Sequence, residues 1–122
     1  DDPSHAALFG PNSLAEVPFS GLVDGLVIAG TIDRLLVTDG RVAVVDFKTG
    51  SFVPETAEQV PSGYLRQMAA YAAALQVIFP GHSIDAALLF TSGPRLVPIP
   101  QALLDVNKPG LGNAKTISAE PG

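Results

Sequence analysis

The chain has 122 residues, which suffices for one compact domain with a packed core and leaves little room for a second. Hydrophobic residues make up 47% and charged residues 16%, which argues against disorder over most of the length. The absence of cysteine excludes a disulfide framework, a thiolate zinc site and a cysteine nucleophile. The net charge of −5 counts against an independent DNA-binding domain, but less against a nuclease that another domain holds on its substrate.

The N-terminal residues 1–5 are acidic and lack the features of a signal peptide. No apolar run reaches the roughly 18 residues that a membrane-spanning helix needs. These observations predict a soluble, cytoplasmic protein without a membrane partner.

The first half of the chain reads as β-structure. Residues 1–15 form a lead-in, where residues 6–9 could close a short helix, as at the end of a truncated helical part. A first strand is expected over residues 16–23, with Pro18 implying an edge position. Two further strands are expected over residues 26–38 and 41–48, joined by the hairpin signal Asp39-Gly40.

The second half begins with a loop and the strongest helix of the chain. The helix is expected over residues 63–79, and strands over residues 84–91 and 95–99 follow it. Residues 106–122 read as a loose C-terminal tail, which leaves residues 16–105 as the core of the domain. Three antiparallel strands followed by a helical crossover predict an α/β fold with a mixed central sheet and a long helix on one face.

Three charged residues stand out because they lie within apolar strands. Asp46 and Lys48 are two residues apart and therefore project from the same face of their strand. Asp33 and Asp46 lie six or seven residues on either side of the hairpin, so they should be nearly opposite each other. Such a carboxylate pair can bind Mg²⁺, beside which a lysine can orient water or stabilise charge on phosphorus. The alternative is an internal Asp–Lys ion pair that only closes the strand end.

Three motifs in this order resemble a known family. The sequence contains Gly30-Thr31-Ile32-Asp33, then Asp46-Phe47-Lys48-Thr49, then Gln67 and Tyr71 on the predicted helix. The G-x-x-D, D-x-K-T and Q-x-x-x-Y motifs are similar to those of RecB-like nucleases in the PD-(D/E)xK superfamily, and residues 13–104 carry the resemblance. The flanking residues 13–18 and 64–71 further resemble the C-terminal nuclease domain of AddA-type helicase–nucleases.

The resemblance implies a mixed central β-sheet of the restriction-endonuclease-like type and a site for Mg²⁺ or Mn²⁺. It assigns Asp33, Asp46 and the backbone carbonyl of Phe47 as metal ligands, and Lys48 as the catalytic lysine. Gln67 and Tyr71 lie one helical turn apart and would face the metal centre or the DNA. A buried apolar stripe is expected on this helix at Tyr64, Met68, Tyr71, Leu75 and Ile78. Tyr71 could therefore equally be a core aromatic residue, whereas Gln67 is polar beside the stripe, which favours a functional or supporting role.

Glu16 opens the first strand and is a possible third carboxylate ligand, although an exposed glutamate is also compatible with the sequence. RecB-like nucleases usually carry a preceding helix with a G-x-x-x-H motif, which is absent here. His5 lacks the glycine that would make it the equivalent residue. The chain is therefore expected to be the C-terminal piece of a longer polypeptide, and metal binding and activity of this piece alone stay open.

The function implied by the resemblance is a metal-dependent DNA exonuclease that acts in double-strand-break repair. An attached helicase would deliver single strands, and an AddB-like protein would be the partner. Two alternatives are a nuclease-like domain that binds DNA or protein without cutting, and a stand-alone RecB-like nuclease. Since no G-x-x-x-x-G-K-[ST] loop occurs, any ATP dependence must come from elsewhere in the parent protein.

Overall fold

The computed structural model describes residues 13–109 and 117–118. In chain order the elements are β1 (Leu14–Val23), β2 (Leu26–Thr38), β3 (Arg41–Lys48), η1 (Ala57–Gln59), α2 (Ser62–Ile78), β4 (Ser83–Phe90), β5 (Arg95–Ile99), α3 (Gln101–Val106) and β6 (Ile117–Ser118). The short helix expected over residues 6–9 and the candidate His5 lie outside the described residues.

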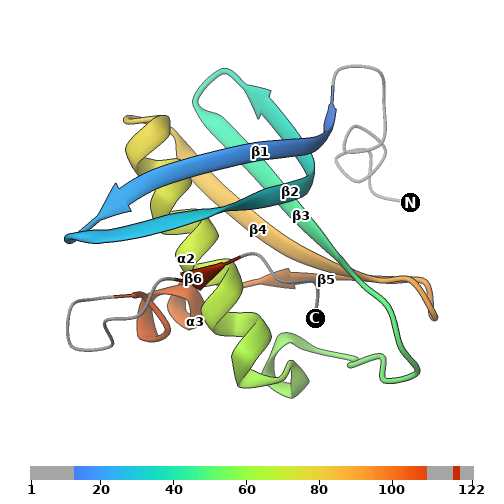
Figure 1. The fold of residues 1–122 in the computed structure, drawn as a ribbon. Helices are drawn as coiled ribbons and strands as arrows, with labels where there is room; N and C mark the ends of the chain where they lie inside the picture. Colours follow the sequence, from blue (N-terminus) through green and yellow to red (C-terminus); the bar gives the residue numbers. More distant parts are fainter. Residues whose placement is uncertain (1–12, 110–116, 119–122) are drawn as a thin grey trace.

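The strands form one mixed sheet in the order β1-β2-β3-β4-β5 (Figure 1). Strands β1, β2 and β3 are antiparallel neighbours, β4 runs parallel to β3 after the α2 crossover, and β5 returns antiparallel to β4. This arrangement confirms the predicted mixed α/β sheet. Pro18 lies on the edge strand β1, as predicted, a position at which a residue without an N–H is tolerated.

Helix α2 packs against one face of the sheet and carries much of the core. Met68, Tyr71 and Leu75 recur at helical spacing and are fully or almost fully buried, as the sequence predicts. Ile78, which was expected to continue this stripe, is instead exposed at the end of the helix. With 17 residues the helix is of ordinary length rather than long.

Two elements were not predicted from the sequence. Helix α3 is only 6 residues long and follows Pro100, so its pattern is too short to be recognised. Strand β6 lies within the segment 106–122, for which a loose tail was expected, and pairs in parallel with Ile28 and Ala29 of β2. It pairs with β2 beyond the stretch that pairs with β3, so the two strands occupy different parts of β2.

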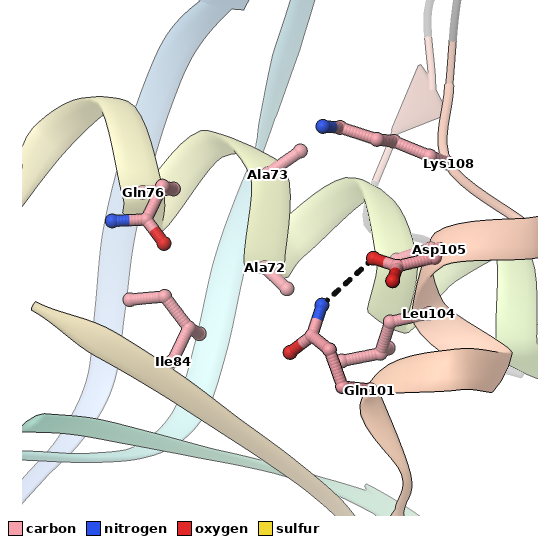
Figure 2. A pocket seen from close by; sticks show the side chains of 9 residues that line it. Ala72, Ala73, Gln76, Ile84, Gln101, Leu104, Asp105 and Lys108 are labelled. Carbon is pink, nitrogen blue, oxygen red and sulfur yellow. Dashed lines mark hydrogen bonds between the residues drawn. The ribbon is translucent and has the colours of Figure 1, made fainter.

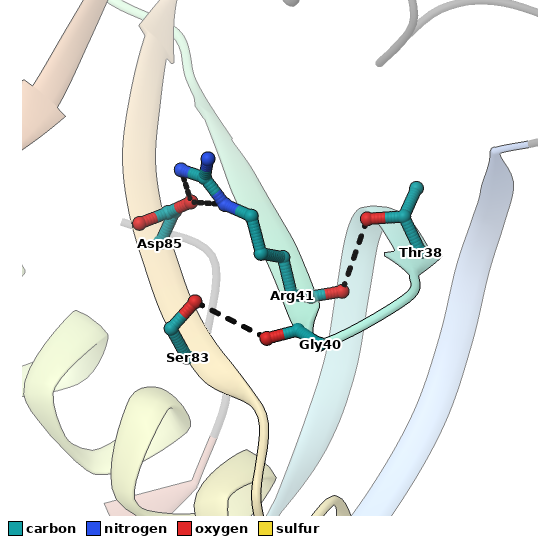
Figure 3. A network of polar contacts seen from close by, with 5 residues as sticks. All are labelled: Thr38, Gly40, Arg41, Ser83 and Asp85. Atoms are coloured by element: carbon teal, nitrogen blue, oxygen red, sulfur yellow. Dashed lines mark hydrogen bonds and ion pairs between the residues drawn. The ribbon is translucent and has the colours of Figure 1, made fainter.

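The starts of β3 and β4 are joined by a polar network (Figure 3). The Ser83 backbone N–H donates to the Gly40 carbonyl at 2.9 Å. The Ser83 hydroxyl donates to the same carbonyl at 3.3 Å, and the Arg41 guanidinium pairs with the Asp85 carboxylate. Thr38 adds a hydrogen bond from its hydroxyl to the Arg41 carbonyl at 3.5 Å. The exposed ion pair contributes little free energy, but the backbone hydrogen bond helps to fix the register that continues to the end of β3.

Within residues 13–109 and 117–118, no helix is both long and apolar enough to cross a membrane.

Candidate active site at the end of strand β3

Strand β3 delivers two charged side chains to the face of the sheet that α2 covers. Because strand residues alternate, Val42, Val44, Asp46 and Lys48 share one face. The two valines are buried in the main core, and the two charged residues that follow are buried as well. The same pattern that builds the core therefore carries Asp46 and Lys48 into it.

Asp33 reaches this place because β2 changes its alternation. Ile28 and Ile32 are four residues apart and fully buried, whereas the next buried residue, Leu35, follows after only three. The paired register of β2 and β3 ends at Arg34 opposite Val45. Beyond that pair, the carboxylate of Asp33 bonds to β3 in place of a backbone carbonyl: its Oδ2 accepts a hydrogen bond from the backbone N–H of Phe47 at 2.7 Å. The hydrogen bonding between β2 and β3 thus ends at a side-chain oxygen. This charge-assisted hydrogen bond brings Asp33 next to Asp46.

Asp46 is a buried carboxylate with only 6% of its surface exposed. Burial raises the pKa of Asp46 to about 6, and the charge and hydrogen bonding of the neighbouring Asp33 add to this rise. The hydrogen bond and the positive charge of Lys48 act in the opposite direction. The negative charge of Asp46 is therefore costly at this buried position, and a nearby cation would offset the cost.

Lys48 is the most deeply buried charge in the described part of the chain, with 1% of its surface exposed. Its Nζ lies 2.9 Å from Oδ2 of Asp46 and donates to Oε1 of Gln67 at 2.7 Å. The ring of Tyr64 covers it from another side, with 4.3 Å between Nζ and the ring centroid. The ammonium is thus held by a carboxylate, an amide and an aromatic face.

Gln67 links Lys48 to Tyr71. Its Nε2 donates to the Tyr71 hydroxyl at 3.3 Å, one helical turn away. Tyr71 is fully buried, and Phe19 packs edge-on against its ring at a centroid distance of 4.9 Å. Burial raises the pKa of Tyr71 to about 12, so its hydroxyl stays protonated. The two alternatives for Tyr71 are therefore compatible, since it is a core aromatic residue that also anchors the polar chain.

The predicted residues Asp33, Asp46, Lys48, Gln67 and Tyr71 are thus brought together. Glu16 lies on β1 at the register position of Asp33, but it is exposed and its backbone has a positive φ of 53°. Among the described residues, no group of three or more Asp, Glu, His or Cys side chains is arranged to hold a metal ion. The ligand roles of Glu16 and of the Phe47 carbonyl stay predictions.

Two adjoining carboxylates suit a hard divalent cation that keeps several water ligands. Mg²⁺ typically takes one or two protein carboxylates and fills its other positions with water and phosphate oxygens. The buried Asp46, whose pKa is raised, would be stabilised in its charged form by such a cation. Asp33 and Asp46 therefore fit Mg²⁺ or Mn²⁺.

Sequence reasoning missed the contact between Tyr64 and Lys48, because Tyr64 fits the apolar stripe of α2. The available signal was its position three residues before Gln67, which places both on one side of the helix.

A small cavity lies elsewhere, between α2, α3 and β4 (Figure 2). Its volume is about 80 Å³, and Ala72, Gln76, Ile84 and Gln101 are among its lining residues. None of the predicted site residues lines it, so it is separate from the candidate active site.

The sequence matches the profile of the PD-(D/E)XK nuclease superfamily over residues 4–120, and the chain belongs to this superfamily. Within it, the chain is similar to an ATP-dependent helicase/nuclease subunit of Streptococcus agalactiae, with 35% identity over 83 residues. It is also similar to the protein of the same name from Oenococcus oeni, with 29% identity over 75 residues. The matched parts cover 68% and 61% of this chain, but only 6% of each relative.

Among solved structures, the chain is similar to one titled "Crystal structure of SSO0001", with a TM-score of 0.48 and 17% sequence identity. The similarity covers 84% of this chain and 52% of that one.

Proposed function

We propose that this chain is a cytoplasmic, metal-dependent deoxyribonuclease domain, the C-terminal exonuclease part of an AddA-type helicase–nuclease in double-strand-break repair. The observation that carries the proposal is the pairing of Asp33 and Asp46 beside the buried Lys48. Membership of the nuclease superfamily and the similarity to helicase/nuclease proteins support it.

Asp33 and Asp46, with the Phe47 carbonyl, would hold Mg²⁺ or Mn²⁺. When bound, the cation would supply a water of lowered pKa and neutralise charge at the scissile phosphate. The Lys48 ammonium lies 2.9 Å from the Asp46 carboxylate, so it would orient the attacking water or a phosphate oxygen. Gln67 would hold the ammonium in place, and Tyr71 would hold Gln67.

The charge of the chain bears on how DNA reaches the site. With a net charge of −5, the chain has little long-range attraction for phosphate. We therefore assign delivery of a single strand to an attached helicase motor, with an AddB-like protein as the partner in the assembly. The similarity to proteins named as helicase/nuclease agrees with this assignment.

The test is cleavage of a labelled single-stranded oligonucleotide by the gene product that carries this sequence. We expect cleavage that requires Mg²⁺ and is abolished by Lys48→Met. The matched control is Lys108→Met, because Lys108 is exposed beyond α3 and should be dispensable. Equal cleavage by wild type and Lys48→Met, or cleavage in the absence of divalent cations, would refute the proposal.

A second candidate is a nuclease-like domain that binds DNA or protein without cutting. It is favoured by the complete burial of Lys48, whose ammonium is already engaged as in a structural ion pair. Calorimetric titration with Mn²⁺ separates the two functions. Binding that is lost in Asp46→Ala supports the nuclease, whereas the absence of Asp46-dependent binding supports the non-catalytic domain.

A further inference from the structure

Tyr64 lies against the proposed catalytic lysine without belonging to the motifs of the sequence. It stands in the first turn of α2, where its backbone N–H donates to the Pro61 carbonyl at 3.0 Å. Its ring is partly buried, and Nζ of Lys48 is 4.3 Å from the ring centroid. This distance is well inside the range in which a cation is attracted by the face of an aromatic ring.

The position of the Lys48 ammonium depends on its contacts. A lysine side chain has a flexible four-carbon stem and can choose among several rotamers. Asp46 and Gln67 hold the ammonium through two short hydrogen bonds, and Tyr64 closes a further side. Tyr64 and Gln67 lie three residues apart on α2, so the helix presents both partners to the lysine together.

We propose that Tyr64 is a positioning residue, whose ring face holds the Lys48 ammonium in the orientation used for phosphodiester hydrolysis. This inference rests on the proposed function. Packing alone gives a weaker account of the aromatic ring, because Tyr64 meets Phe90 at a centroid distance of 6.4 Å in a tilted arrangement. A leucine could fill that apolar contact but offers no π face to a cation.

The first test is a spectroscopic signature that does not depend on cleavage. In the chain labelled with ¹³C-lysine, the Cε protons of Lys48 should resonate upfield because of the Tyr64 ring current. Tyr64→Phe should keep this shift, and Tyr64→Leu should lose it. A Lys48 signal at the same position in wild type and Tyr64→Leu would overturn the proposal.

The second test uses the gene product under steady-state conditions with Mg²⁺. If the full strength of an ordinary cation–π contact is lost in the transition state, the rate falls by about 2- to 30-fold. We expect the kcat of Tyr64→Leu to be about tenfold lower than that of the wild type, with KM unchanged. The Tyr64→Phe variant, which keeps an aromatic ring, should have the wild-type kcat. The control is Phe79→Leu, which removes a partly buried aromatic residue at the other end of α2 and should leave kcat unchanged.

The outcomes separate the two proposals. If the wild-type protein does not cut DNA, the proposed function fails, while the ring-current shift still decides whether Tyr64 holds Lys48. If the wild type cuts and Tyr64→Leu keeps the wild-type kcat, the positioning role is refuted and the nuclease assignment stands. Equal losses in Tyr64→Phe and Tyr64→Leu also contradict it, because the phenylalanine retains the ring.

Discussion

The buried pair of Asp46 and Lys48 predicts strong coupling between two substitutions. In Asp46→Asn, the ammonium of Lys48 stays in a site with 1% exposure and loses its only anionic contact within hydrogen-bond distance among the described residues. In Lys48→Met, the carboxylate of Asp46 stays beside Asp33 without its positive partner. The double variant leaves neither charge behind in the apolar surroundings.

The size of the effect follows from the burial. Removing one partner of a buried ion pair typically costs about 3–5 kcal/mol, because the other charge remains uncompensated. Lys48→Met should lie near the lower end, about 3 kcal/mol, because the Asp46 carboxyl can take up a proton once its positive partner is gone. Asp46→Asn should cost much less, because burial already disfavours the carboxylate and because Gln67 and the Tyr64 ring still contact the ammonium. Replacing both charges by residues of similar volume is often nearly neutral, so the interaction energy in the cycle should reach about 2–3 kcal/mol.

The assay is urea denaturation of the four proteins at pH 7.5 with EDTA, which keeps divalent cations out. The matched control cycle uses Arg41→Met and Asp85→Asn, whose side chains are 67% and 52% exposed and should couple by less than about 1 kcal/mol. Free-energy changes that simply add in the Asp46 and Lys48 cycle would refute the reasoning about the buried pair.

Three further predictions concern stability. Because the pKa of Asp46 is raised from 3.8 to about 6, protonation stabilises the folded chain below pH 4, and this stabilisation should be lost as pH rises through 6. Between pH 4 and pH 7, the free energy of unfolding of the metal-free wild type should fall by on the order of 3 kcal/mol, and that of Asp46→Asn should not. A wild-type free energy of unfolding that stays constant over this pH range in urea titrations would contradict the prediction. Tyr71→Phe should lower the free energy of unfolding by about 1 kcal/mol and Tyr71→Ala by about 3–5 kcal/mol, because only the alanine loses the packing against Phe19. Equal urea midpoints for the two variants would contradict this prediction. Gly21→Leu should lower the free energy of unfolding by about 1–3 kcal/mol, because even a Cβ added at Gly21 would lie 3.4 Å from Ala74 of α2. Unchanged stability in thermal or urea unfolding would contradict this and show that the strand and helix can move apart.

Much of the fold could be predicted from local patterns. Strands β2, β3 and β5 have the predicted bounds, since the Asp39-Gly40 turn and the alternation leave little freedom. Alternation also placed Asp46 and Lys48 on one face. Counting residues from the turn also predicted that Asp33 lies close to Asp46, and the structure confirms this.

The rest depends on contacts that alternation cannot give. In β2 the alternation changes between Ile32 and Leu35, which are both buried in the main core, and the sequence pattern did not predict this change. The bridge from Lys48 through Gln67 arises only when the helix docks on the sheet. For Glu16 the sequence left open a metal ligand or an exposed side chain, and the structure shows it exposed.

The most direct test of the nuclease assignment compares two carboxylate-to-amide substitutions on neighbouring strands. The measurement is the single-turnover rate at which the gene product cuts a labelled single-stranded oligonucleotide in Mg²⁺. Loss of several kcal/mol of charge stabilisation predicts that Asp46→Asn cuts at least about 100-fold more slowly than wild type. Asp85→Asn, whose carboxylate is exposed and paired only with Arg41 among the described contacts, should cut at the wild-type rate. Similar rates for Asp46→Asn and Asp85→Asn would contradict the assignment.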